Sequence, residues 1–123
     1  MDAIDLHVHS TFSDGTLTPS ELISRAKQFH LAAMALTDHD TIEGIPEAVQ
    51  AASEQNLELV PGVELSTFWD EKEIHIVGLF IDYTDKTFQK ELESLRDVRR
   101  NRNIAMCEKF TQLGRSEEHT SEL

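Results

Sequence analysis

Short apolar runs alternate along the chain with longer segments in which apolar residues recur every three or four positions. The short runs are typical of buried strands and the longer segments of amphipathic helices. We predict strands at residues 3–6, 31–36, 57–60 with 63–65, and 72–81, and helices at residues 19–29, 45–55 and 84–113. Strands that alternate with helices in this order indicate an α/β fold.

The first helix has a well-defined predicted start, and the strand before it is predicted to be buried. Thr18 precedes Pro19, and Glu21 stands three residues after Thr18, which is the pattern of a capping box with proline in the first turn. The residues of this helix predicted to face the core are Leu22, Ile23, Ala26 and Phe29. Residues 68–71 are predicted as a polar hairpin-like loop.

Composition narrows the class of protein. The 123 residues are enough for one small domain, and 39% hydrophobic with 28% charged residues suits a globular chain. No apolar run is long enough to cross a membrane, and no charged-then-apolar leader precedes the first predicted strand. The single cysteine, Cys107, cannot form an intramolecular disulfide, and it fits a reducing compartment. We therefore expect a cytoplasmic protein without a membrane partner.

The formal net charge of −12 affects which ligands are plausible. So acidic a chain is not expected to carry a broad surface for nucleic acid, because that binding depends on phosphate neutralisation by Lys and Arg. A small phosphorylated substrate stays compatible with this charge, since some carboxylates can face bound metal ions. The oligomeric state is left open.

The last nine residues, 115–123 (RSEEHTSEL), interrupt the final helical pattern just after Gly114. The string matches the translation of a common sequencing adapter, so we expect residues 1–114 to be the partial domain and the tail to lie outside the fold. A natural, disordered acidic tail is the alternative. If the adapter interpretation is correct, the natural protein was cut short at this point.

Polar residues with metal-binding side chains follow several of the predicted strands. His7 and His9 stand two apart, so on a strand they point to the same face and can bind one ion. A single His-x-His pattern is weak, because it arises often by chance. Here it is followed by residues 37–40 (TDHD), 61–64 (PGVE) and 73–75 (EIH), each at the end of an apolar run or within one. Packing alone does not account for this series.

Taken together, residues 5–10 (DLHVHS), 13–15 (SDG), 36–40 (LTDHD), 61–66 (PGVELS) and 74–78 (IHIVG) make the chain resemble the polymerase-and-histidinol-phosphatase (PHP) family of metal-dependent phosphoesterases. Within it, the chain is most similar to the stand-alone bacterial branch that acts on nucleoside 3′,5′-bisphosphates and short RNA ends. The resemblance implies a distorted barrel of seven β/α units, of which this chain is the N-terminal half. It also implies up to three divalent metal ions, namely Mn, Zn or Fe, as cofactors.

The resemblance assigns roles to individual residues. It implies that His7 and His9 bind a first ion, that Glu64 bridges the first and second, that His75 joins the second, and that Asp14 and His39 bind a third. Asp38 is expected to orient ligands without binding metal itself. For Asp40 two interpretations stay open, the same orienting role or a residue at the entry to the next helix.

The reaction that the resemblance implies is hydrolysis of a phosphomonoester by a metal-bound hydroxide. The substrate would be a nucleoside 3′,5′-bisphosphate or the 5′ end of a short RNA. Another metal-dependent hydrolase, acting on amide bonds, and a non-catalytic metal-binding module are the alternatives. The family's second half supplies a further His and an Asp-x-His pair, which this chain does not contain. We therefore expect the 123-residue polypeptide to be poorly stable and weakly active or inactive.

Two arginines occupy unexpected positions in the last predicted helix. Arg99 and Arg102 continue the apolar stripe of that helix, where a solvated basic face does not explain them. Because an inward guanidinium needs an anionic partner, a substrate phosphate is one candidate. An internal salt bridge and extension to the surface are the alternatives.

Overall fold

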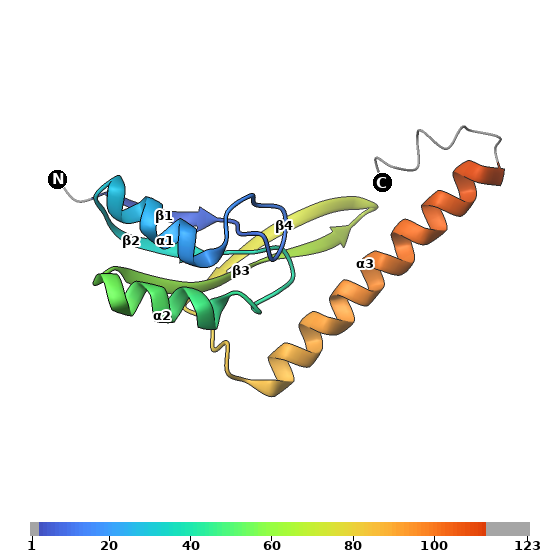
Figure 1. Ribbon diagram of the computed structural model, residues 1–123. Helices are drawn as coiled ribbons and strands as arrows, with labels where there is room; N and C mark the ends of the chain where they lie inside the picture. Colours follow the sequence, from blue (N-terminus) through green and yellow to red (C-terminus); the bar gives the residue numbers. More distant parts are fainter. Residues whose placement is uncertain (1–2, 113–123) are drawn as a thin grey trace.

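The computed structural model describes residues 3–112, so Leu113 and the predicted tail lie outside the described residues. Within these residues the chain forms four strands and three helices, whose arrangement Figure 1 shows. Their bounds are β1 (Ala3–Val8), α1 (Pro19–Gln28), β2 (Leu31–Leu36), α2 (Ile45–Gln55), β3 (Glu58–Trp69), β4 (Lys72–Leu79) and α3 (Lys86–Gln112). The predicted order of elements and the α/β class are both confirmed.

The four strands form one curled sheet in the order β1-β2-β3-β4. β1, β2 and β3 are parallel, and β4 returns antiparallel to β3. The two parallel connections run through α1 and α2, which lie beside each other along the sheet in Figure 1. Because the sheet curls without closing, the fold is the half-barrel that the sequence predicts.

Two apolar clusters hold the helices to the sheet. The first joins α1, α2 and β2 through Ile23, Ala26, Met34, Ala51, Ala52 and Leu57. The second joins the start of α2, the sheet and α3 through Leu36, Ile42, Ile45, Ala48, Val63 and Leu92. One face of the sheet is therefore occupied by packing, which leaves the other face at the strand ends for polar side chains.

The start of α1 agrees with the prediction, and its end corrects it. Thr18 accepts a hydrogen bond from the Glu21 N–H, and the Glu21 side chain accepts one from the Thr18 N–H, which completes the capping box. The prediction that Phe29 faces the core is wrong, because this residue is 67% exposed. Phe29 follows the last helical residue at the C-cap, beyond the part of α1 that packs against the sheet.

The prediction that the first strand is buried is also wrong. Most residues of β1 are exposed, and Ile4 is 59% exposed. The physical reason is position, since β1 lies at the edge of the described sheet and pairs with β2 alone. An apolar run predicts a strand, but its burial depends on what covers it.

β3 is longer than predicted and runs without a break through Pro61 to Trp69. Phe68 and Trp69 therefore belong to the strand, and the turn to β4 consists of Asp70 and Glu71, with φ angles of 51° and 63°. Two positive φ angles are the signature of a two-residue type I′ hairpin, whose twist suits long paired strands. The extension carries the strand well beyond Glu64.

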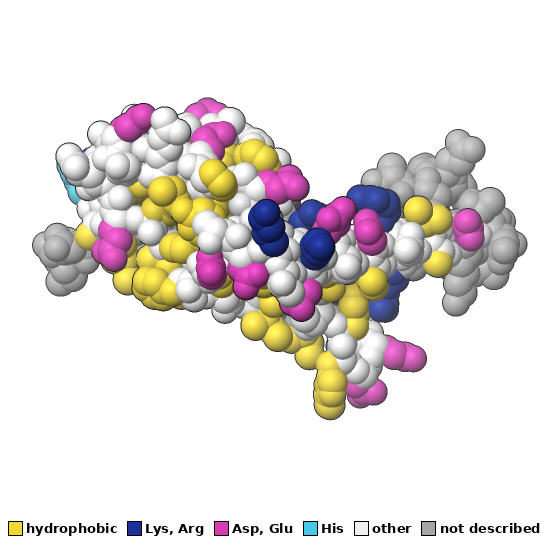
Figure 2. All heavy atoms as spheres, turned by 90° about the horizontal axis from the view of Figure 1, so that it is seen from below, with side chains coloured by type: hydrophobic (Ala, Val, Ile, Leu, Met, Phe, Trp, Pro, Cys, Tyr) yellow, Lys and Arg dark blue, Asp and Glu magenta, His cyan; other side chains and the backbone are white. Residues whose placement is uncertain are grey.

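α3 contacts the rest of the molecule mainly through its N-terminal half. Leu92 is 2% exposed and belongs to the second apolar cluster, while the far end of the helix projects away from the sheet in Figure 1. Lysine and arginine side chains lie along this helix in Figure 2. Those whose side chains the structure describes are Lys86, Lys90, Arg96, Arg99, Arg100 and Arg102. Within residues 3–112, no helix is both long enough and apolar enough to cross a bilayer.

Candidate metal centre

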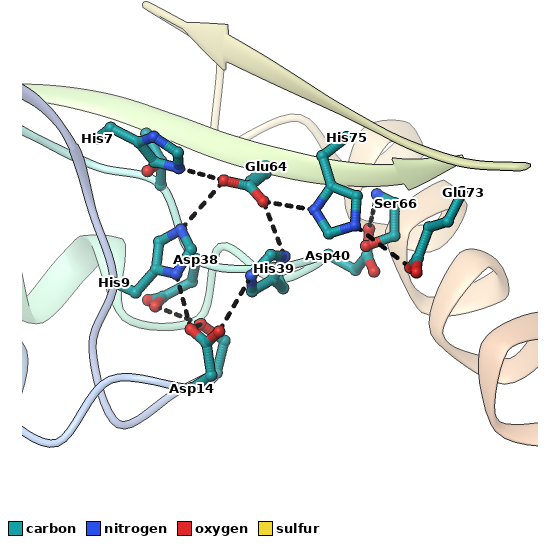
Figure 3. Close-up of polar contacts among 12 residues, drawn as sticks. His7, His9, Asp14, Asp38, His39, Asp40, Glu64, Ser66, Glu73 and His75 are labelled. Atoms are coloured by element: carbon teal, nitrogen blue, oxygen red, sulfur yellow. Dashed lines mark hydrogen bonds and ion pairs between the residues drawn. The ribbon is translucent and has the colours of Figure 1, made fainter. Parts of the chain in front are cut away.

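The alternation of side chains along β1 places two histidines on the polar face of the sheet. Val8 packs against the first apolar cluster, so His7 and His9 on either side of it point the opposite way. The Nε2 atoms of both rings contact the same oxygen, Oε1 of Glu64, with His9 at 3.2 Å. The predicted pair of histidines therefore converges on one carboxylate (Figure 3).

Glu64 lies at the centre of the site. Val63 belongs to the second apolar cluster, so the next residue of β3 faces the opposite side of the sheet. Glu64 is only 4% exposed, although it is a carboxylate. Its second oxygen, Oε2, lies 2.7 Å from Nδ1 of His75 and 3.2 Å from Nδ1 of His39. A single buried carboxylate thus meets four imidazoles.

His75 reaches Glu64 from β4. In the antiparallel β3–β4 pair, His75 stands opposite Ser66, so it shares a sheet face with Glu64 two residues away. Its other ring nitrogen, Nε2, lies 3.3 Å from an oxygen of Glu73. Glu73 was not predicted as part of the site, although it stands two residues before His75 on β4 and therefore shares its sheet face.

Asp14 and His39 form the outer side of the same cluster. The Asp14 carboxylate contacts Nδ1 of His9 at 2.7 Å and Nε2 of His39 at 3.2 Å. Gly15 makes this approach possible, since a Cβ atom there would lie 2.2 Å from the backbone oxygen of His9. The loop that carries Asp14 can therefore pack directly against the backbone of the His9 segment only with glycine at that position.

These contacts make three overlapping groups in which the potential ligand atoms all lie within 4.8 Å of one another. The groups are His7, His9 and Glu64; His9, Asp14 and His39; and His39, Glu64 and His75. Nδ1 of His39 is buried and lacks a well-aligned hydrogen bond, although Glu64 is close. Mixed imidazole and carboxylate donors, with one donor left unsatisfied, fit a first-row divalent metal ion.

The charges within the cluster stabilise one another. Burial raises the pKa of Glu64, but the hydrogen bonds of His75 and His7 and the charge of His39 outweigh burial and lower that pKa to about 2. Burial also acts to raise the pKa of Asp14, which the His9 hydrogen bond and the charges of His39 and His9 lower overall. The hydrogen bond to Glu64 raises the pKa of His75. A metal ion binds the neutral form of His75, so metal and proton compete for this ring.

Asp38 holds the segments around the histidines without joining the three groups. The residue is 2% exposed. Its Oδ1 accepts hydrogen bonds from the Ser10 N–H at 2.6 Å and the Ser13 hydroxyl at 2.7 Å, and its Oδ2 accepts one from the Ser10 hydroxyl at 2.7 Å. Ser10 follows His9, and Ser13 precedes Asp14. Neither serine was singled out from the sequence for this contact, although both stand inside the quoted motifs.

Asp40 is fully buried and does not act only at a helix entry. Its Oδ1 accepts a hydrogen bond from the Ser66 N–H at 2.8 Å, and its Oδ2 pairs with Nη1 of Arg99 at 2.7 Å. Arg99 therefore makes the internal salt bridge that was one of its predicted alternatives. Arg102 lies instead over the ring of Phe68, with its guanidinium carbon 3.7 Å from the ring centroid.

The sequence of this chain is similar to those of known proteins. The PHP domain profile matches residues 5–117. A 5′-3′ exoribonuclease of Haemophilus influenzae is 46% identical over 110 residues, which are 89% of this chain and 40% of that protein. A 3′,5′-nucleoside bisphosphate phosphatase of Chromobacterium violaceum is 45% identical over 102 residues, covering 83% of this chain and 36% of that protein. The chain thus spans about two fifths of the length of these relatives.

Solved structures with a similar fold are also known. A C. violaceum protein described as an amidohydrolase, with bound sulfate and no metal, superposes with a TM-score of 0.79 at 42% identity, over 90% of this chain and 39% of that one. A Bifidobacterium adolescentis protein described as a metal-dependent phosphoesterase gives a TM-score of 0.78 at 32% identity, over the same shares. With the profile match over nearly its whole length, this chain belongs to the PHP domain family.

Proposed function

We propose that the protein carrying this sequence is a metal-dependent phosphoesterase that releases phosphate from a small phosphorylated substrate. The observation that carries the proposal is the convergence of four histidines on the buried carboxylate of Glu64, with Asp14 beside two of them. The substrate classes that we propose are nucleoside 3′,5′-bisphosphates and short RNA 5′ ends. The names of the H. influenzae and C. violaceum relatives support both classes.

The three groups described above share His9, His39 and Glu64, and each group can hold one ion. We propose that His7 and His9 hold one divalent ion with Glu64, that His75 and Glu64 hold a second, and that Asp14 and His39 hold a third. Manganese, zinc and iron all suit such nitrogen and oxygen donors. When bound, divalent ions lower the pKa of water and neutralise the charge of phosphate oxygens.

The chain's own residues supply positioning and charge. Asp38 fixes the backbone and side chain of Ser10, and thereby the segment that carries His9. Arg102 is proposed as a contact for a substrate phosphate, because its guanidinium lies on the same side of α3 as Arg99 and uses an aromatic face as its partner. Nη1 of Arg99 is bound to Asp40, so Arg99 could contact a phosphate only through its other guanidinium N–H groups.

Basic residues support an anionic substrate. α3 carries seven lysines and arginines against four acidic residues in its sequence, in a chain whose net charge is −12. A cation-rich helix next to a cluster of carboxylates and imidazoles gives an anion one favourable approach to an otherwise acidic molecule. This arrangement favours a compact phosphorylated substrate over a long nucleic acid, which would need a wide basic surface.

Amide hydrolysis is the second candidate, because one structural neighbour is described as an amidohydrolase. The same neighbour holds sulfate, a tetrahedral anion with the shape and charge distribution of phosphate. Recognition of such an anion suits phosphate-ester chemistry better than a neutral amide.

The test measures phosphate release and amide cleavage in parallel. The 123-residue chain and the longest product of its reading frame in the source DNA are each incubated with Mn²⁺ and one of three substrates. These are adenosine 3′,5′-bisphosphate, a 5′-phosphorylated oligoribonucleotide and an N-acyl amino acid. We expect the longer product to release phosphate from the bisphosphate or a mononucleotide from the oligoribonucleotide. This activity should be reduced at least 100-fold in Glu64→Gln and unchanged in Glu71→Gln, which alters an exposed turn residue. Amide cleavage without phosphate release would overturn the proposal.

A further inference from the structure

Residues 38–40 continue the sheet beyond the end of β2. The Asp40 N–H donates to the Glu64 carbonyl oxygen at 3.0 Å, and the Glu64 N–H donates to the Asp38 carbonyl oxygen at 3.0 Å. His39 and Glu64 therefore form a parallel bridge, and these are two of the proposed metal ligands. Whatever fixes this bridge also fixes the relative placement of the two side chains.

Asp40 cannot extend the bridge with its backbone. Its φ angle is 54°, which turns the chain out of the extended conformation directly after His39. The Asp40 side chain replaces the backbone as hydrogen-bond partner. Its Oδ1 lies 2.8 Å from the Ser66 nitrogen and accepts the hydrogen bond that this N–H would otherwise give to a neighbouring strand. Asp40 is thus hydrogen-bonded to β3 on both sides of Leu65, to Glu64 through its backbone and to Ser66 through its carboxylate.

A carboxylate in this position needs a counter-charge. Asp40 has no exposed surface, and an unpaired buried charge is strongly destabilising. The counter-charge comes from α3, where Nη1 of Arg99 lies 2.7 Å from Oδ2 of Asp40. Arg96 adds a hydrogen bond from Nη1 to the Asp40 carbonyl oxygen at 2.7 Å. The two arginines therefore hold both the side chain and the backbone of one residue.

We propose that Arg99 is a positioning residue for the metal centre, which it stabilises by holding Asp40 and thereby the His39–Glu64 bridge. This inference rests on the proposed metal centre, but not on the identity of the substrate. It gives Arg99 a function in the substrate-free protein. A phosphate contact, in contrast, would make Arg99 matter only when substrate is bound.

The structure separates this role from simple attachment of α3. The helix is also held by Leu92 in the apolar core and by Arg96 at the Asp40 carbonyl. Truncation of Arg99 should therefore leave α3 in place while it removes the counter-charge of Asp40. Arg100 is the matched control, because it is the neighbouring residue, it is 69% exposed, and its described ion pair is with Asp97 on the same helix.

The experiment titrates Mn²⁺ into the 123-residue chain without substrate and follows free Mn²⁺ by electron paramagnetic resonance. Loss of a group that orients metal ligands typically weakens binding about 10–100-fold. We expect a loss in this range for Arg99→Ala, partial recovery in Arg99→Lys, and a change of less than about twofold in Arg100→Ala. Wild-type affinity in Arg99→Ala would overturn the proposal, and a raised KM of that variant in the separate phosphate-release assay of the longer product would then assign Arg99 to substrate binding.

A second measurement decides the case in which the wild-type chain binds no Mn²⁺, which would refute the proposed metal centre itself. Nuclear magnetic resonance of the histidine rings in the metal-free protein reports their placement directly. We expect Arg99→Ala to shift the His39 resonances, and Arg99→Lys and Arg100→Ala to shift them less. His39 resonances that are identical in wild type and Arg99→Ala would overturn the positioning role. Far-UV circular dichroism of each variant identifies any that fail to fold, and Arg99→Lys then provides the test.

Discussion

Asp38 gives the sharpest quantitative prediction, because its carboxylate is buried and accepts three hydrogen bonds. Asp38→Ala leaves the buried Ser10 N–H without its acceptor and removes the charged partner of the Ser10 and Ser13 hydroxyls. A buried donor without a partner costs about 1–3 kcal/mol, and hydrogen bonds to a charged group contribute about 1.5–3 kcal/mol each. Relief from burying a charge offsets part of this, so we expect a loss of about 2–4 kcal/mol in the free energy of unfolding.

The assay is urea unfolding followed by far-UV circular dichroism, with a chelator present so that metal binding does not contribute. Asp97→Ala is the control, since this aspartate is exposed on α3 and its loss should change stability by less than about 0.5 kcal/mol. A double-mutant cycle with Ser10→Ala should give a coupling energy of about 0.5–3 kcal/mol. Equal unfolding midpoints for Asp38→Ala and Asp97→Ala would refute the reasoning.

Three further predictions concern the packing of α3, the close approach of β3 to its neighbours at Gly62, and the charges of the metal-free site. Leu92→Ala should reduce the free energy of unfolding by about 2–5 kcal/mol, because Leu92 is 2% exposed in the second apolar cluster; a loss below about 1 kcal/mol in urea unfolding would contradict this packing. Gly62→Ala should cost about 1–3 kcal/mol and lower the melting temperature, since its Cβ would lie 2.8 Å from a Thr37 methyl and 2.9 Å from a backbone oxygen; an unchanged melting temperature would show that the strands can separate there. The pKa of Glu64 is lowered to about 2 and that of His75 is raised, so the pair stabilises the metal-free protein fully between their ordinary values of 4.5 and 6.5. This contribution is lost as the pH falls toward 2 or rises past the raised pKa of His75, and a difference between wild type and Glu64→Gln that does not vary with pH would argue against it.

The sequence predicted the elements best where local signals mark both ends. α2 begins and ends at the predicted residues, since Gly44 precedes it and Asn56 ends it in the left-handed conformation. β2 was also predicted to the residue. The burial of β1 was not predictable, because an apolar run such as the one around Ile4 looks the same at the edge of a sheet and in its middle.

In the site, too, the contacts that depend on local alternation were predictable and those that depend on tertiary packing were not. The convergence of His7, His9 and Glu64 follows from side-chain alternation on parallel strands, whose ends meet at one edge of the sheet. The contact of His75 with Glu64 depends on the hairpin register, and the partner of Arg99 depends on where a helix 59 residues after Asp40 returns to the sheet. Local patterns carry no information about either arrangement. The sequence accordingly left a salt bridge and a phosphate contact open for Arg99.

The spread of the cluster along the chain bears on how the protein reaches its folded state. His7 and Glu64 are separated by 57 residues, and the two lie in direct contact. A covalent cross-link across such an interval would lower the entropy of the unfolded chain by an amount equivalent to about 4 kcal/mol. An ion bound by both residues would act as a reversible cross-link between them. It could form only after the sheet has brought His7 and Glu64 together. The supply of that ion would then affect how much folded protein accumulates, before any substrate is turned over.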